Sequence, residues 1–167
     1  RFMKTCSGRK RYNVLGALDV VSKKVTTVTN DAYITATEVC ELLRKIASEY
    51  VGKEIHLVLD NARYQKCAIV QELAAKLSIS LEYIPPYSPN LNLIERFWKH
   101  VKGRLRTKYY EEFPVFRETI DHIVGCSDGK DKKAVDSLIG DKVQLFDDLV
   151  PINSSTFVSK KAEAKAA

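Results

Sequence analysis

The sequence predicts an α/β fold in which helices pack on the faces of a β-sheet. Its 167 residues, 45% of them hydrophobic, match a single domain with a sizeable core. A hairpin-like pattern opens the chain, and helical and strand-like segments alternate after it, which is the order that places helices against a sheet. The sequence contains no apolar run long enough to cross a membrane, and its opening residues do not resemble a secretory signal. We therefore expect a cytoplasmic protein and exclude a collagen-like, disordered or membrane chain.

The predicted hairpin lies within the first thirty residues. Residues 11–21 have the composition of a strand, and the β-branched residues of 24–29 form its partner. Ser22 and Lys23 are expected to form the turn between them.

A helix is predicted over residues 35–50. Thr35 and Glu38 form a capping box at its start, and Gly52 closes its end. The apolar residues between these signals fall on one helical stripe, which consists of Val39, Leu42, Leu43, Ile46, Ala47 and Tyr50.

Strands and helices alternate through the rest of the chain. The apolar run Leu57-Val58-Leu59 is typical of a strand buried on both faces. Three prolines within residues 85–89 forbid both ladder pairing and helix, so a rigid turn is expected there. The expected elements are a strand over 54–59, a helix over 65–77, a strand over 81–84, a helix with Asn92 as its N-cap, a helix over 114–124 and a short helix over 132–139. We expect one domain over residues 1–150 and a tail over 151–167 that is disordered from about residue 159.

The net charge of +6 comes from two short blocks. Residues 1–24 hold seven basic residues and one acidic residue, and residues 96–108 hold six basic residues and no acidic one. Clustered Lys and Arg side chains are what a phosphate-binding surface needs, because each neutralised phosphate releases counterions. A solvated surface is the alternative interpretation of such a block.

Cysteine and histidine carry no recognisable site. The four cysteines lie tens of residues apart without a C-x-x-C pair, and the three histidines are equally scattered. The sequence therefore predicts neither a zinc site nor a disulfide framework.

Two acids stand out by their position. Asp60 follows the apolar strand, and Glu95 lies in the first turn of the helix after the prolines. The carboxyl ends of strands are where α/β sheets bind ligands. Each acid also has a structural interpretation, because Asp60-Asn61 suits a turn and an acid in a first helical turn favours the helix dipole.

The text around these two acids resembles the catalytic core of DDE transposases, and among them the mariner-related bacterial insertion-sequence group. The resemblance rests on Leu57-Val58-Leu59-Asp60-Asn61, on Tyr83-Ile84-Pro85-Pro86-Tyr87-Ser88-Pro89-Asn90-Leu91-Asn92-Leu93-Ile94-Glu95, and on the 34 residues that separate Asp60 from Glu95. It extends from about residue 7 to residue 150. It implies a ribonuclease-H-like mixed sheet with flanking helices, which periodicity alone does not name.

The resemblance also implies a chemistry. Asp60 and Glu95 correspond to two of the family's three acids, which would hold Mg²⁺ or Mn²⁺ for DNA cleavage and strand transfer at transposon ends. We expect their carboxylates to lie within about 6 to 7 Å of each other if both bind one ion. The implied partner is DNA, a homodimer is compatible with the family, and the implied location is the bacterial nucleoid. The expected DNA-binding residues are Arg63, Lys99, Lys102, Arg104 and Arg106.

The family's first acid has no counterpart here. It belongs on a first sheet strand before the hairpin, whereas no acid precedes Asp19 in this sequence. We expect that strand and its acid to lie upstream of Arg1, which would leave two unpaired strand edges between the hairpin's second strand and the strand before Asp60. This chain would then be incomplete and inactive alone.

Four alternatives stay open. Asp19 could replace the missing acid, although it lies on the wrong strand. The chain could be another nuclease, integrase or resolvase of the same fold, or a remnant that binds DNA or protein without catalysis. Asn61 could orient a ligand or serve only as a turn residue.

Overall fold

The structure is a computed structural model that describes residues 11–85, 92–108, 110, 112–125 and 137. The predicted turn at 85–89 lies outside these residues apart from Pro85, and the tail over 151–167 lies outside them entirely. The predicted helix over 132–139 lies outside them as well, apart from Ser137.

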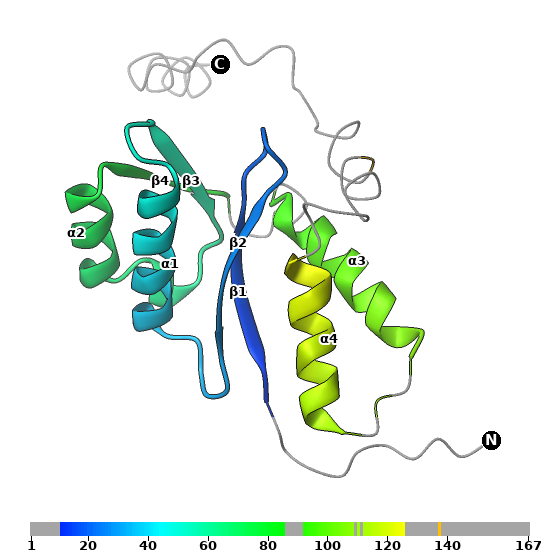
Figure 1. Ribbon diagram of the computed structural model, residues 1–167. Coiled ribbons are helices and arrows are strands. Elements are labelled where there is room, and N and C mark those ends of the chain that lie inside the picture. The colour runs from blue at the N-terminus through cyan, green and yellow to red at the C-terminus, as the bar shows by residue number, and fades with distance from the viewer. Residues whose placement is uncertain (1–10, 86–91, 109, 111, 126–136, 138–167) are drawn as a thin grey trace, which may run out of the picture.

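The described strands form two separate pairs. Strand β1 (Asn13–Leu18) pairs antiparallel with β2 (Val25–Asn30), with Asn13 opposite Asn30 and Leu18 opposite Val25. Strand β3 (Ile55–Leu59) pairs parallel with β4 (Ile79–Tyr83). Within the described residues no backbone ladder joins one pair to the other (Figure 1).

The hairpin is confirmed, but its first strand is shorter than predicted. The Asp19 carboxylate accepts a hydrogen bond from the Val21 backbone N–H at 2.8 Å and one from the Ser22 hydroxyl, and Lys23 has a φ of 63°. An acid that binds its own following backbone favours a turn over a strand. Residues 19–21, which composition alone assigns to the strand, therefore belong to the turn.

The capping box also forms as predicted and begins helix α1 (Ala36–Glu49). Thr35 accepts from the Thr37 backbone N–H, and the Glu38 carboxylate accepts from the Thr35 backbone N–H at 2.6 Å. The Thr35 hydroxyl also donates to the Glu38 carboxylate, and this bond, followed by the one from the Thr35 backbone, lowers the pKa of Glu38 to about 2. Gly52, at a φ of 73°, turns the chain toward β3.

The next two elements shift relative to the prediction. Only α2 (Ala68–Lys76) is α-helical, because residues 63–65 form a short 3-10 turn before it. Strand β4 begins two residues early, at Ile79, since Ile79 is buried against α1 and α2.

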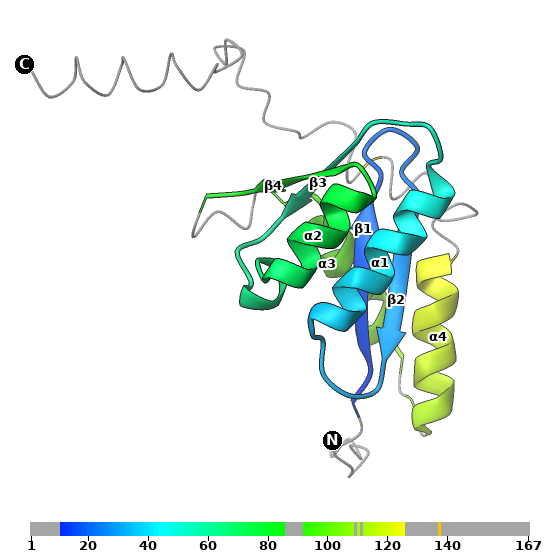
Figure 2. The same cartoon turned by 90° about the vertical axis from the view of Figure 1, so that its left-hand side faces the viewer.

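Strand β3 is not buried on both faces. Leu59 is buried, but Val58 is 49% exposed and His56 lies on the same open face. Helices α1 and α2 cover the other face, as Figure 2 shows. The prediction from the apolar run at 57–59, that both faces of this strand are buried, is therefore wrong.

The two last helices pack against the opposite side of the hairpin from α1 (Figure 1). Helix α3 (Ile94–Arg106) buries Phe97 and Val101, and α4 (Phe113–Gly125) matches its prediction within one residue at each end. The hairpin is thus the middle layer of three, with α1 on one face and α3 and α4 on the other. The two small sheets, one antiparallel and one parallel, with their flanking helices match the predicted α/β class.

Candidate active site

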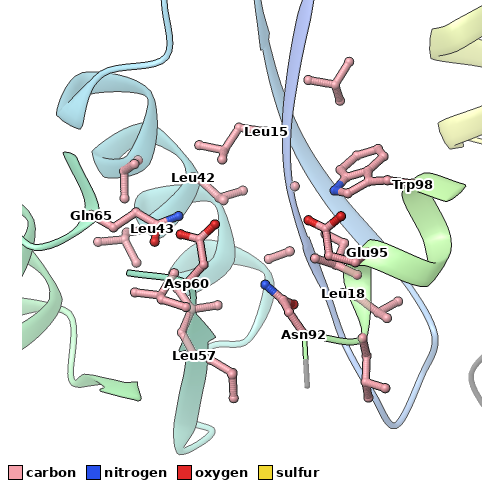
Figure 3. A pocket seen from close by; sticks show the side chains of 18 of the residues that line it. Leu15, Leu18, Leu42, Leu43, Leu57, Asp60, Gln65, Asn92, Glu95 and Trp98 are labelled. Carbon is pink, nitrogen blue, oxygen red and sulfur yellow. The ribbon is translucent and has the colours of Figure 1, made fainter. Parts of the chain in front are cut away.

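A cleft separates β1 from β3. Its walls are formed by β1, α1, β3, the segment after β3 and the start of α3. The residues that carry the argument below are Leu15, Leu43, Asp60, Gln65, Glu95 and Trp98 (Figure 3). We call this the β1–β3 cleft. The unpaired edges were predicted between the hairpin's second strand and the strand before Asp60. This prediction is wrong in one respect, because the hairpin's first strand, β1, borders the cleft.

Asp60 is positioned by the end of β3. It is the first residue after the strand, it is exposed, and its carboxylate accepts a hydrogen bond from the Ala62 backbone N–H at 3.2 Å. Burial, together with the negative charge of Asp60, raises the pKa of the neighbouring Tyr64. One turn interaction thus orients the exposed Asp60 side chain at the cleft.

Asn61 braces the two strand ends. Its side-chain amide donates to the Ile84 backbone carbonyl, and the Ile84 backbone N–H donates to the Leu59 carbonyl at 3.0 Å. The structure therefore favours the structural interpretation of Asn61, which holds the ends of β3 and β4 together behind Asp60.

Glu95 is positioned by the docking of α3 on the hairpin. Trp98 lies directly over Gly16, where an added Cβ would stand 2.9 Å from the Trp98 ring. This close approach requires glycine at position 16 and holds the first turn of α3 beside β1. The interpretation of Trp98 as a packing residue is confirmed.

Asn92 is not the N-cap of α3. Leu93 is the residue that precedes the helix, and the first turn is closed by backbone hydrogen bonds from Glu95 to Asn92 and from Arg96 to Leu93, both 3.1 Å. The Glu95 backbone N–H, from which an Asn92 side-chain cap would accept a hydrogen bond, already donates to the Asn92 backbone carbonyl, so the side chain is not needed as a cap. Figure 3 shows the Asn92 amide directed into the cleft.

The two predicted acids line the same cleft. Asp60 belongs to the β3 wall and Glu95 to the α3 wall, and Figure 3 shows them across the cavity from each other. The sequence separates them by 34 residues. Their shared cleft is the arrangement that joint binding of one ion requires, and the separation of about 6 to 7 Å stays a prediction.

Gln65 is a cleft residue that the sequence did not reveal. It is only 7% exposed, and its side-chain Oε1 is buried with no hydrogen-bond donor among the residues that the structure describes. Nothing in the sequence marks this glutamine, because its burial depends on how the short turn over 63–65 folds against α1.

The Asp19 side chain is hydrogen-bonded within the hairpin turn. Burial opposes its ionisation, but hydrogen bonds from Ser22, the Val21 backbone and the Tyr50 hydroxyl outweigh this effect and lower its pKa. Its contacts are those of a turn residue, and it is not among the residues that line the β1–β3 cleft.

The predicted DNA-binding residues are all exposed. They are Arg63 at the turn after β3 and Lys99, Lys102, Arg104 and Arg106 on α3. The apolar stripe of the same helix, Ile94, Phe97, Trp98, Val101 and Leu105, faces the core as predicted. The amphipathic division of α3 is therefore real, whereas the role of its basic face stays a prediction.

The donor set of the cleft suits a hard cation. Asp60 and Glu95 supply carboxylate oxygens and Asn92 supplies an amide. Mg²⁺ prefers oxygen ligands and retains several waters, so two carboxylates fit it. The described residues contain no group of three or more His, Cys, Asp or Glu side chains that could hold a metal.

Residues 1–117 match the family of DDE superfamily endonucleases. The chain belongs to this family. Both Asp60 and Glu95 fall within the matched region. No curated protein matches the sequence.

Two of the solved structures that match this chain illustrate the shared fold. One is the intasome of simian T-cell lymphotropic virus in complex with the PP2A regulatory subunit B56 gamma, with a TM-score of 0.57, 20% identity and coverage of 72% of this chain. The other is the catalytic core domain of BIV integrase, with a TM-score of 0.54, 17% identity and coverage of 72% of this chain and 82% of that one. The chain spans 43% of the length of the intasome chain. The predicted ribonuclease-H-like fold is confirmed.

None of the helices in the described residues has the length and apolar character of a membrane span.

Proposed function

We propose that this chain is the catalytic domain of a DDE transposase of the mariner-related bacterial insertion-sequence group. Its reaction would be the cleavage of transposon ends and the joining of the 3′ hydroxyl to target DNA. The observation that carries the proposal is that Asp60 and Glu95 line one cleft, within the residues that match the DDE endonuclease family. The reaction would take place at the nucleoid in the bacterial cytoplasm, with DNA as the partner and two copies of the chain as the working unit.

Asp60 and Glu95 are the proposed metal ligands. A bound Mg²⁺ or Mn²⁺ supplies Lewis-acid stabilisation of the charge that develops on phosphate oxygens. The turn bond from Ala62 orients Asp60, and the contact of Trp98 with Gly16 fixes the helix that carries Glu95. The protein's contribution is thus to hold two oxygen donors on opposite walls of one cleft.

Cleavage requires more than these two acids. The family resemblance implies a third carboxylate, and Asp19 is held in the hairpin turn instead. We expect the 167-residue chain alone to bind the metal and DNA without cutting DNA. This behaviour also defines the rival function, a DNA-binding remnant that binds no metal at Asp60 and Glu95.

Metal binding tests the proposal. Titration with Mn²⁺ should show a site that weakens at least about tenfold in both Asp60→Asn and Glu95→Gln, since each variant removes a charged ligand. Glu82→Gln is the matched control, because Glu82 is an exposed acid on β4 outside the cleft. Equal Mn²⁺ affinity in all three variants and the wild type would overturn the metal site and favour the remnant.

The salt dependence of DNA binding tests the basic face of α3. Replacement of Lys99, Lys102, Arg104 and Arg106 with Gln should flatten the slope of log affinity against log salt by up to about four units, near 0.9 for each lost phosphate contact. The control removes the same charge elsewhere, through Gln at Arg44, Lys53, Lys66 and Lys76. A slope that changes equally in both variants would show that net charge acts and the α3 face does not.

A further inference from the structure

The outer edge of the hairpin belongs to β2. In the part of the chain that the structure describes, β2 pairs with β1 alone, so no described strand lies along its other edge. Figure 2 shows β2 between α1 and α4. The β1–β3 cleft lies on the other side of the hairpin, where β1 borders it. A ligand at the outer edge of β2 would therefore leave the proposed metal site free.

The register of the hairpin shows which residues of β2 direct their backbone outward. The Asp19 N–H donates to the Lys24 carbonyl at 2.9 Å, so the backbone of Lys24 faces β1. Successive residues of an antiparallel strand alternate between bonding to the partner strand and pointing away from it. Val25, Thr27 and Thr29 therefore direct their N–H and C=O groups to the outer edge.

A groove follows this edge. A cavity of about 320 Å³ is lined by Val25, Thr27 and Thr29, the same three residues whose backbone points outward. Asp121 and Val124 of α4 line its wall. The groove thus exposes unpaired backbone groups of β2 over a span of five residues, which is what an added strand requires.

Lys45 of α1 guards the centre of the edge. Its Nζ donates to the Thr27 carbonyl at 2.9 Å and so occupies the middle outward acceptor. A lysine at an exposed edge opposes unwanted strand pairing. An incoming strand must release this bond, and a carboxylate on that strand would bind the freed ammonium group.

The other charged side chains of the groove already have charged or polar partners. Arg117 forms an ion pair with Asp31 at 3.0 Å, and Asp121 accepts a hydrogen bond from the Tyr12 hydroxyl. Lys45 instead bonds a neutral backbone carbonyl. It is therefore the charge that an acidic ligand gains most by binding.

The two sides of the groove differ in character. Val25 packs against the cluster of α3 and α4, Thr27 points to the same side, and Val124 lines the groove there. Lys45 reaches the edge from the α1 side. Because side chains alternate along a strand, the complementary segment has apolar residues toward α4 and an acid toward α1.

We propose that the outer edge of β2 binds an extended segment of a protein partner, about five residues long, that carries an acidic residue on its α1 side. The span from Val25 to Thr29 sets this length. The acid takes the place of the Thr27 carbonyl as the partner of Lys45, and the segment continues the hairpin as a third strand. The site concerns protein recognition and is independent of the proposed metal chemistry.

Charge opposes a second copy of the chain as the occupant. The fullest symmetric pairing of two β2 edges places Thr27 opposite Thr27 of the other copy. The two Lys45 side chains would then meet, and like charges repel. The acidic segment has no such penalty.

Amide hydrogen exchange locates the peptide. The probe is acetylated and amidated Val-Glu-Val-Glu-Val, which places an acid on either side of its centre and so serves both strand directions. Saturating probe should slow exchange of the Val25, Thr27 and Thr29 amides at least about tenfold, because each gains a bond. Unchanged exchange would overturn the proposal. Slow exchange without the probe would show that a second copy or another part of the chain covers the edge, and would overturn it as well.

Methylated probes test the pairing. Only every second amide of an added strand faces β2. Methylation of the central valine amide should abolish binding, whereas methylation of the two glutamate amides should be tolerated. The reverse pattern would turn the glutamates toward α4 and contradict the pairing with Lys45. Equal effects would exclude strand addition.

A charge exchange tests the role of Lys45. The chain should bind the probe about two- to fivefold more tightly than Val-Gln-Val-Gln-Val, as expected for an exposed ion pair. Lys45→Gln should remove this preference. Arg44→Gln is the matched control and should keep it, because Arg44 is an exposed base of α1 outside the groove. A preference that persists in both variants, or disappears in both, would overturn the assignment of Lys45.

Discussion

The two sides of the β1–β3 cleft differ in how completely they are packed. The hairpin has α1 on one face and α3 and α4 on the other, so its alternate residues enter two apolar clusters. The β3–β4 pair has α1 and α2 on one face only, and its other face carries exposed His56, Val58, Ser80 and Glu82. The proposed acids come from both sides, Asp60 from the end of β3 and Glu95 from the helix docked on the hairpin.

The difference in packing between the hairpin and the β3–β4 pair explains how the cleft is held open. Helix α1 is the element that contributes to clusters on both sides, through Leu42 and Ile46 toward the hairpin and Val39 and Leu43 toward α2 and β4. In the part of the chain that the structure describes, the two strand pairs are therefore fixed through a shared helix and not through a shared backbone ladder. The position of Asp60 relative to Glu95 depends on side-chain packing, so substitutions on the two sides should differ in their effects.

The largest effect is expected from the hairpin side. Phe97 is 1% exposed in the cluster that joins α3 and α4 to the hairpin, and Phe97→Ala should lower the free energy of unfolding by about 3 to 5 kcal/mol through the cavity it leaves. Val58→Ala on the open face of β3 should cost less than about 1 kcal/mol, since half of that side chain is already in water. Urea denaturation measures both, and equal costs would contradict the described difference between the two sides.

A smaller effect is expected where α3 meets β1. An alanine Cβ at position 16 would lie 2.9 Å from Trp98, whose ring also packs against Phe97, so Gly16→Ala should cost about 1 to 3 kcal/mol. Gly103→Ala is the matched control within α3, because its Cβ meets nothing and a helical alanine should add about 0.5 to 1 kcal/mol. Differential thermal unfolding separates the two, and a stabilised Gly16→Ala variant would disprove the close contact.

The start of the shared helix should give a modest, pH-dependent effect. Thr35→Ala should cost about 1 kcal/mol at neutral pH because it removes the N-cap acceptor. The pKa of Glu38 is lowered to about 2, so its contribution is present above the ordinary carboxyl pKa near 4.5 and is lost as the pH falls toward 2. Wild-type stability should therefore fall more steeply than that of Glu38→Gln across this window, as acid titration of unfolding would show; parallel curves would exclude the capping role.

The smallest effect belongs to the open face. Glu82, and next Glu54, hydrogen-bond His56 and raise its pKa. The stabilisation is present below the unfolded pKa of about 6.5 and is lost as the pH rises through the folded value. An NMR titration should show the pKa of His56 falling in Glu82→Gln, and salt should reduce the difference because these groups are exposed. An unchanged value would mean that Glu82 does not interact with His56 in solution.

Local signals in the sequence determined most of the elements. The capping box of Thr35 and Glu38 begins α1 where it was expected, and the apolar stripe of α3 faces the core, because both depend on neighbours within one or two helical turns. The errors are also local. Asp19 ends β1 early by binding its own turn, and the Asn92 side chain is not used as a cap because backbone bonds close that turn. The motifs around Asp60 and Glu95 indicated the DDE family, because a motif depends only on residue types and their spacing along the chain.

Only the tertiary structure decided which surfaces meet. The run Leu57-Val58-Leu59 does not reveal that one face of β3 is open, because an apolar strand has the same composition whether one or two layers cover it. The burial of Gln65 and the placement of Asp60 opposite Glu95 depend on α1 docking both strand pairs, and these contacts join residues far apart in the chain. The sequence by itself determined the local elements and the family, whereas the cleft between β1 and β3 arises from long-range packing, which no local pattern records.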